Sequence, residues 1–173
     1  MKRRTSQVQY CLLMVVHLFV DWGGGIMFQL RHIGIYVRDL KKMEDFYCNV
    51  FNMNVICHEI VQSDELIHDF LQDPNGSVKI SKLITEYGKV VGSGDMVELL
   101  EVTSKGDQYN PFRLKLYCPG ATHLGFSVAG IEETVDRILH LGGMQLTTIH
   151  LMPNKKRCCF CRDIEGNGLE LIE

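Results

Sequence analysis

The sequence predicts an α+β protein built from two similar units, each made of a strand, a helix and then further strands. The first observation is a repeat, because His32 to Val37 reads His-Ile-Gly-Ile-Tyr-Val and His123 to Val128 reads His-Leu-Gly-Phe-Ser-Val. The second is that each copy leads into an apolar pattern of helical spacing. The third is that both units end alike, in Glu98-Leu-Leu-Glu101 and in Glu170-Leu-Ile-Glu173. Together these features predict an internally duplicated fold.

The helix of each unit follows from the spacing of its apolar side chains. The first unit predicts a helix over 40–51, with Asp39 as its N-cap. The second unit predicts a helix that starts at Ile131 and ends at Gly142-Gly143, because glycine adopts the backbone conformation that terminates helices. The apolar stripes are Leu40, Met43, Phe46, Tyr47, Val50 and Phe51 in the first helix, and Ile131, Val135, Ile138, Leu139 and Leu141 in the second.

The remaining segments complete the two units. Residues 63–73 predict a short amphipathic helix that forms a flap over one end of the sheet, and they account for most of the extra length of the first unit. Gly92-Ser93-Gly94 is expected to be a hairpin turn. Residues 106–120 are polar, contain two prolines and are the expected linker. Further strands are expected at 55–60, 78–85, 96–103, 145–149, 158–162 and 168–172.

Composition excludes several classes of protein. The chain has 173 residues and a formal net charge of −3, which argues against a nucleic-acid binder because such proteins usually carry a clustered basic face. Its apolar fraction of 46% is ordinary for a globular protein, not for a disordered one. The seven cysteines are odd in number and have no repeating spacing, which indicates reduced thiols and a cytoplasmic protein.

The N-terminal stretch differs in character from the rest. Residues 10–20 are apolar except for one histidine and follow a basic start, an arrangement shared with secretory signals, but the run is too short to span a bilayer. We expect residues 1–26 to be an extension that is not part of the working domain. The domain then covers 27–173, with module one at about 30–105 and module two at about 121–173.

Alternation along the strands places the repeated polar residues on one face of each unit. His32 and His123 lie opposite the apolar face, each two residues before a glycine. Glu98 and Glu170 each share a face with apolar side chains, where an ionised carboxylate is costly unless a positive group pairs with it. Two histidines and two glutamates placed alike in a duplicated fold suit a divalent cation such as Zn, Ni, Co, Fe or Mn.

The same residues resemble the motifs of the vicinal oxygen chelate superfamily, which includes glyoxalases, bleomycin resistance proteins and extradiol dioxygenases. The resemblance covers about residues 30–173. It rests on 31–40 followed by Phe46-Tyr47, on Glu98-Leu-Leu-Glu101, on 122–128 and on 162–172. It implies paired βαβββ modules that form a cupped, glyoxalase-like mixed sheet around a metal. The implied metal ligands are His32, Glu98, His123 and Glu170.

The resemblance also implies a chemistry. It points to a metal-dependent lyase or isomerase of the glyoxalase I type, which moves a proton on a small substrate with vicinal oxygens. Glu170 is the expected catalytic base, by similarity to glyoxalase I. A homodimer is expected, and the metal site can form within one chain or across the dimer. The expected substrate-binding residues, which share the inward faces, are Tyr36, Met96, Leu100 and Ser127.

Two alternatives remain open at this point. One is an isomerase similar to methylmalonyl-CoA epimerase, which relies on the same proton-transfer chemistry, although epimerases commonly carry glutamine at the place of Glu98. The other is a non-catalytic protein that binds a small molecule, as bleomycin resistance proteins do. The complete set of four ligand residues disfavours the second alternative.

Overall fold

The computed structural model describes residues 30–92, 94–103 and 123–173. The expected N-terminal extension and the expected linker at 106–120 lie outside the described residues.

Module one forms a four-stranded mixed sheet in the order β1-β4-β3-β2. β1 pairs with β4 in parallel, and β3 pairs antiparallel with both β2 and β4. Helix α2 (Leu40–Phe51) connects β1 to β2, and the Asp39 carboxylate accepts a hydrogen bond from the Lys42 backbone nitrogen at 3.0 Å. The helix and its cap are therefore as the sequence predicts. The strands are β1 (Ile33–Val37), β2 (Asn54–Gln62), β3 (Val78–Ile84) and β4 (Met96–Val102).

Module two repeats this arrangement. Its sheet has the order β5-β9-β8-β6, with the short β7 paired to β8, and β5 pairs in parallel with β9 as β1 does with β4. Helix α5 (Ile131–His140) follows β5, and Gly142 takes a positive φ of 92° just after it. The strands are β5 (His123–Ser127), β6 (Met144–Gln145), β7 (His150–Leu151), β8 (Arg157–Arg162) and β9 (Gly168–Ile172). The α+β fold with two βαβββ-like sheets is thus confirmed.

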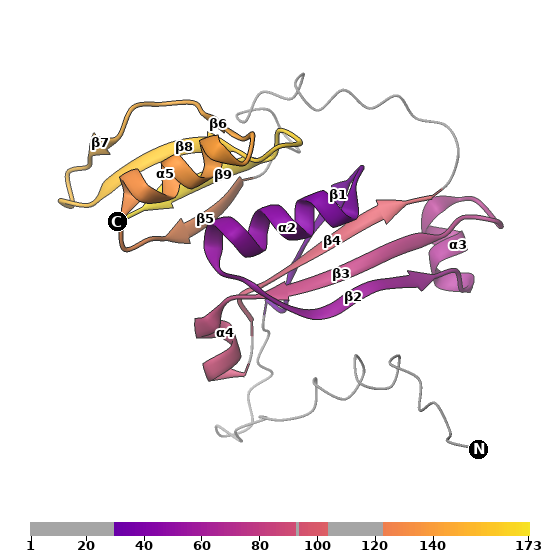
Figure 1. Ribbon diagram of the computed structural model, residues 1–173. Helices are drawn as coiled ribbons and strands as arrows, with labels where there is room; N and C mark the ends of the chain where they lie inside the picture. Colours follow the sequence, from indigo (N-terminus) through magenta and orange to yellow (C-terminus); the bar gives the residue numbers. More distant parts are fainter. Residues whose placement is uncertain (1–29, 93, 104–122) are drawn as a thin grey trace, which may run out of the picture.

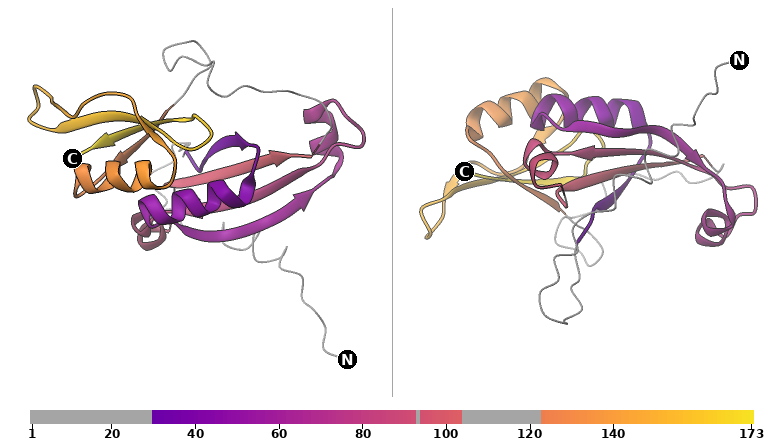
Figure 2. Two further views of the ribbon diagram at one scale, coloured as in Figure 1. Left: turned by 45° about the horizontal axis from the view of Figure 1, so that its top comes forward. Right: turned by 90° about the horizontal axis from the view of Figure 1, so that it is seen from below.

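Both helices lie on the same side of the two sheets (Figures 1 and 2). Their apolar stripes and the sheet residues beneath them form one core, which runs through both modules. Phe51 at the end of α2 stacks on Phe126 of β5, with ring centroids 3.8 Å apart. We call the opposite side of the sheets, which α2 and α5 do not cover, the open face.

Polar contacts also fix the modules to one another. The Tyr47 hydroxyl of α2 donates a hydrogen bond to the buried Asp163 carboxylate, which lies in the turn between β8 and β9, at 2.9 Å. In the same turn, the Glu165 carboxylate accepts hydrogen bonds from the backbone nitrogens of Arg38 at 2.8 Å and Asp39 at 3.0 Å. The module-two turn thereby satisfies backbone donors at the start of α2.

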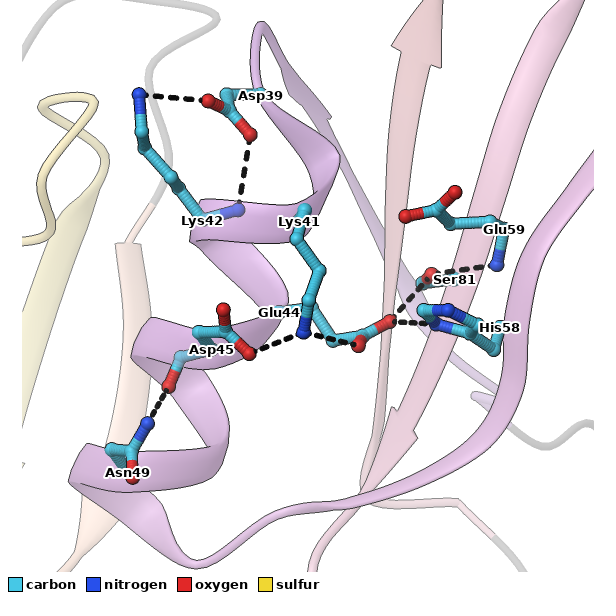
Figure 3. Close-up of polar contacts among 9 residues, drawn as sticks. All are labelled: Asp39, Lys41, Lys42, Glu44, Asp45, Asn49, His58, Glu59 and Ser81. Carbon is cyan, nitrogen blue, oxygen red and sulfur yellow. Dashed lines mark hydrogen bonds and ion pairs between the residues drawn. The ribbon is translucent and has the colours of Figure 1, made fainter.

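A buried carboxylate connects α2 to its own sheet. Glu44 is buried, accepts a hydrogen bond from the Ser81 hydroxyl of β3 at 2.9 Å, and lies 2.8 Å from Nδ1 of His58 on β2 (Figure 3). The pairing of β2 with β3 shifts register on both sides of Cys57, and this irregular stretch holds His58 beside the helix. The polar group is therefore accommodated in the core by its hydrogen-bond partners.

Several local expectations are wrong. The single strand expected at 145–149 is replaced by the two-residue strands β6 and β7, because this stretch pairs with β8 only at two separate points. A short helix, α4 (Glu86–Val91), occupies the connection from β3 to β4, and Gly92 is its left-handed C-cap and not part of a simple hairpin turn. Leu139 is half exposed, because it lies at the edge of the apolar stripe of α5.

The expected flap exists as helix α3 (Glu65–Leu71), which is capped by the side chain of Asp64. It lies at the far end of β2 and β3, away from module two (Figure 1). Nowhere in the part of the chain that the structure describes is there a helix whose length and apolar character would let it cross a membrane.

Candidate metal centre

The strand register places the repeated polar residues side by side on the open face. Gly34 of β1, Glu98 of β4 and Lys82 of β3 are direct neighbours across the first sheet. Gly125 of β5, Glu170 of β9 and Phe160 of β8 are direct neighbours across the second sheet, at the equivalent positions. The two modules thus present the same layout with one difference, a lysine in the first where the second has a phenylalanine.

In module one, His32 meets Glu98. His32 immediately precedes β1, and its Nε2 atom lies 3.2 Å from Oε2 of Glu98. The other oxygen of this carboxylate, Oε1, lies 2.9 Å from Nζ of Lys82. Glu98 is largely buried, with 12% of its side chain exposed, so the Lys82 ammonium group compensates its charge and His32 supplies a second polar contact.

In module two, His123 meets Glu170. The Nε2 atom of His123 lies 3.1 Å from Oε2 of Glu170. Oε1 of the same carboxylate is contacted by the Cys158 thiol, whose sulfur lies 3.4 Å away. Burial, followed by the contact with Glu170, raises the pKa of this thiol, so Cys158 acts as a weak neutral donor. The Phe160 ring stands edge-on to His123 at a centroid distance of 5.5 Å.

The second glutamate of each Glu-x-x-Glu motif has a different role. Side chains three positions apart in a strand point to opposite faces of the sheet, so Glu101 and Glu173 lie on the helix side. Glu101 accepts a hydrogen bond from the Leu40 backbone nitrogen at 2.9 Å, and Glu173 accepts one from the Ile131 backbone nitrogen at 3.1 Å. Each carboxylate therefore caps the first turn of its own module's helix. Each Glu-x-x-Glu motif thus places its first glutamate on the open face and uses its second glutamate to cap a helix.

The four expected ligands form two pairs and not one cluster. Among residues 30–92, 94–103 and 123–173, no three His, Cys, Asp or Glu side chains are close enough together to hold a metal ion. No buried side-chain nitrogen or oxygen in this part of the chain lacks a hydrogen-bond partner. The donor chemistry of the pairs suits a divalent cation, and each pair contains two of the four expected ligands.

A cleft lies where the two modules meet beside the first pair. His32 and Met96 line it from module one, and Leu124 and Phe126 line it from module two. The exposed Arg31 also lines this cleft. A small molecule in the cleft would therefore contact apolar side chains of both modules and lie next to His32.

The four residues expected to bind substrate lie on the open face at different depths. Tyr36 is half exposed, and its pKa is raised by burial and then by the nearby charge of Glu98. Met96 and Leu100 lie on either side of Glu98 along β4 and are half-buried, and Ser127 on β5 is exposed. The substrate contacts of these residues stay a prediction.

Lys82, Cys158 and Phe160 are site residues that sequence reasoning did not assign. A signal for Lys82 was available, because it is a lysine between Ile80 and Ile84 on the apolar face of a strand, where a cation needs a partner. No such signal exists for Cys158, because a buried cysteine in a strand is usually a packing residue.

The fold and the paired polar residues define a protein of two βαβββ modules with a candidate metal centre. The chain belongs to the glyoxalase/bleomycin resistance protein/dioxygenase superfamily, whose model matches residues 29–171. Comparison with the curated proteins finds no match.

Comparison with the solved structures finds many chains with the same fold. A glyoxalase family protein from Bacillus cereus has a TM-score of 0.74 and 19% identity, covering 87% of this chain and 96% of that one. A glyoxalase/bleomycin resistance protein/dioxygenase domain from Frankia has a TM-score of 0.59 and 18% identity, covering 85% and 92%. A variant of the fosfomycin resistance protein FosX from Listeria monocytogenes, in complex with Mn(II) and 1S,2S-dihydroxypropylphosphonic acid, has a TM-score of 0.52 and 20% identity, covering 84% and 92%. At these identities the likeness establishes the fold alone.

Proposed function

We propose that this protein is a divalent-metal-dependent enzyme of the glyoxalase I type, which carries out proton-transfer lyase or isomerase chemistry on a small substrate with vicinal oxygens. The observation that carries the proposal is the duplicated His–Glu pair on the open face, His32 with Glu98 and His123 with Glu170. One such pair is a common ion pair or hydrogen bond. Two at equivalent register positions of a duplicated fold are explained best by a shared ligand.

These four residues would hold the metal. Imidazole and carboxylate donors together suit Mn, Fe, Co, Ni or Zn. A divalent ion bound there would polarise the substrate oxygens and favour loss of a neighbouring carbon-bound proton. The Mn(II) present in the FosX complex, a protein of the same fold, is consistent with this choice of cofactor.

Of the two glutamates, Glu170 is the better base. Both oxygens of Glu98 are engaged, one by His32 and the other by the Lys82 ammonium. The Oε1 atom of Glu170 has only the thiol of Cys158 as its partner among these contacts, and a quarter of its side chain is exposed. An oxygen held by a weak neutral thiol donor is freed to approach a substrate more easily than one held by an ammonium group. Glu170 would accept a proton from one carbon of the substrate and donate it to the neighbouring carbon.

The two pairs need a second copy of the chain to become one site. The contacts of Tyr47 with Asp163 and of Glu165 with the start of α2 fix how the modules lie in one chain. A twofold-related partner could place its second pair opposite the first pair of this chain, and the reverse contact would complete an equivalent second site. We therefore propose a homodimer with two metal sites.

Metal content is the first test. The full chain is reconstituted with Mn, Ni, Co or Zn, desalted and measured by mass spectrometry. We expect about one ion per chain in the wild type and loss of that ion in His123→Ala. The matched control is His140→Ala, which removes an exposed histidine at the end of α5. If the wild type retains no ion with any of the metals, the metal-dependent function is rejected in favour of a metal-free binding protein.

A mixing experiment tests the dimer. The variants His32→Ala and His123→Ala are refolded together, so that mixed dimers form. A site built across the dimer is intact once in each mixed dimer, so random mixing should recover about one ion per four chains. A site built within one chain is never intact in such a mixture. Failure to recover any ion would contradict the shared site.

The reaction is tested with the methylglyoxal–glutathione adduct as substrate. Glu170→Gln keeps an oxygen ligand but cannot accept the proton, so turnover should fall by a factor of about 100 or more while protein folding is unchanged. Unchanged turnover in this variant would reject Glu170 as the base. If the metal-loaded wild type shows no turnover, glyoxalase activity is excluded and other substrates with vicinal oxygens are screened.

A further inference from the structure

The two modules differ at the open-face position next to the paired glutamate. Lys82 is the direct neighbour of Glu98 in the first sheet, and Phe160 is the direct neighbour of Glu170 in the second. The two glutamates are equivalent, so the difference between their neighbours is a difference between the two sides of the proposed metal site.

Lys82 is held next to the site and remains accessible. Its Nζ atom lies 2.9 Å from Oε1 of Glu98, and 30% of its side chain is exposed. An ammonium group has three donors, and the contact with Glu98 uses one. A ligand that approaches Glu98 from the open face can therefore also meet the ammonium group.

The balance of charge around the site favours an anion. The charge of a divalent ion would be cancelled by the two carboxylates of Glu98 and Glu170, so Lys82 leaves a net positive charge. Arg31 and Asp95 both line the cleft beside His32, and their opposite charges leave this balance unchanged. A partly desolvated site with an uncompensated cation attracts an anionic group by Coulomb interaction.

The module-two side has the opposite character. Phe160 presents an aromatic ring edge-on to His123, at an interplanar angle of 86°. On this side, a substrate meets an apolar wall instead of a cation. The two sides together can orient a small molecule by its charged end.

We propose that Lys82 is a specificity-determining residue, which selects substrates that carry an anionic group such as a carboxylate or phosphonate, with the anion directed to module one and the uncharged remainder to Phe160. This inference rests on the proposed function, because it places the substrate at the same metal site. It goes beyond that function because it specifies the charge of the substrate and the residue that recognises this charge.

The test uses two titrations of the full chain by calorimetry. The first titrates Mn(II) alone, and the second titrates methylphosphonate into Mn(II)-loaded protein. Lys82→Met removes the charge and keeps the length of the side chain, and Lys82→Arg keeps the charge. The matched control is Lys79→Met, because Lys79 lies on the same strand and makes a similar ion pair with Glu101 at 3.0 Å, but on the helix side.

We expect Lys82→Met to bind methylphosphonate at least about tenfold more weakly than the wild type. Lys82→Arg should stay within about threefold, and Lys79→Met should be unchanged. The affinity of Lys82→Met for Mn(II) should be equal to or tighter than that of the wild type, because a neighbouring cation opposes binding of the ion.

Several results would overturn the proposal, and they differ from failure of the function. A wild type that binds Mn(II) but no methylphosphonate up to about 10 mM would refute the anionic substrate. Equal methylphosphonate affinity in Lys82→Met would refute the role of Lys82. Loss of Mn(II) binding in Lys82→Met would show that the lysine only supports Glu98. A wild type that binds no Mn(II), Ni, Co or Zn would reject the metal-dependent function itself, and the inference with it.

Discussion

Replacing Tyr47 by phenylalanine tests how strongly the two modules are coupled. The Tyr47 hydroxyl donates to Oδ2 of Asp163 at 2.9 Å, and the two residues are 0% and 3% exposed. Three other donors to Asp163 remain in the variant, namely the side chain of Asn167 and two backbone nitrogens of the turn. A hydrogen bond to a charged, buried acceptor contributes about 1.5–3 kcal/mol, so Tyr47→Phe should lower the free energy of unfolding by this amount.

The same variant has a distinct dependence on pH. Burial, followed by the charge of Asp163, raises the pKa of Tyr47 well above its ordinary value in the folded state. Tyr47 therefore stabilises the fold fully below about pH 10, the pKa of tyrosine in the unfolded chain, and this stabilisation is lost as the pH rises further. The wild type should lose up to about 1.4 kcal/mol per pH unit more than Tyr47→Phe above pH 10, so the difference between the two proteins shrinks.

Urea unfolding followed by circular dichroism measures both effects. At pH 7 the variant should unfold at a lower urea concentration with an unchanged m-value, and thermal unfolding should shift down by roughly 4–10 °C. Tyr87→Phe is the matched control, because Tyr87 on α4 is 72% exposed, and it should change stability by less than about 0.5 kcal/mol. If Tyr47→Phe behaves like this control, the hydrogen bond between the modules does not stabilise the fold and the reasoning is refuted.

Three further predictions concern single positions. Glu101→Ala removes the carboxylate that accepts from the Leu40 backbone nitrogen, while the N-cap Asp39 remains, and it should cost about 1 kcal/mol in urea unfolding with unchanged metal content. Glu98→Ala should instead abolish metal binding, and equal loss of metal in both variants would contradict the division of roles. Ser81→Ala leaves the buried Glu44 carboxylate with one donor fewer and should destabilise the protein by about 1–3 kcal/mol at pH 7, and a neutral effect would show that water replaces the hydroxyl. Gly143→Ala should cost about 1–3 kcal/mol in thermal or urea unfolding, because the added Cβ would lie 2.6 Å from a carbonyl oxygen of β8. Wild-type stability in that variant would mean that the turn after α5 can shift.

The duplicated His–Glu pair is informative because its two halves are not identical. At equivalent register positions, Glu98 has Lys82 as its neighbour and Glu170 has Phe160, so the two carboxylates lie in different surroundings. The same comparison separates Glu98, which is held by two partners including a cation, from Glu170, which is held more weakly.

The helices were the elements easiest to predict from sequence. α2 has the predicted boundaries and the predicted cap, because the spacing of apolar residues and the N-cap chemistry of Asp39 are local properties. The strand expected at 145–149 and the helix α4 were not predicted correctly. Short segments of this kind carry little periodicity, and their structure depends on what pairs with them.

The duplication, the two βαβββ-like units and the histidines and glutamates on the open face could all be predicted from the amino-acid sequence. This was possible because strand alternation and helical spacing depend only on neighbouring residues. The three-dimensional structure was needed to show that these residues form two separate pairs, that Lys82 and Cys158 contact the two carboxylates, and that Glu101 and Glu173 cap helices. Those contacts join strands and helices that are distant in sequence, so strand register and module docking, which are set by the packing of the whole core, decide them.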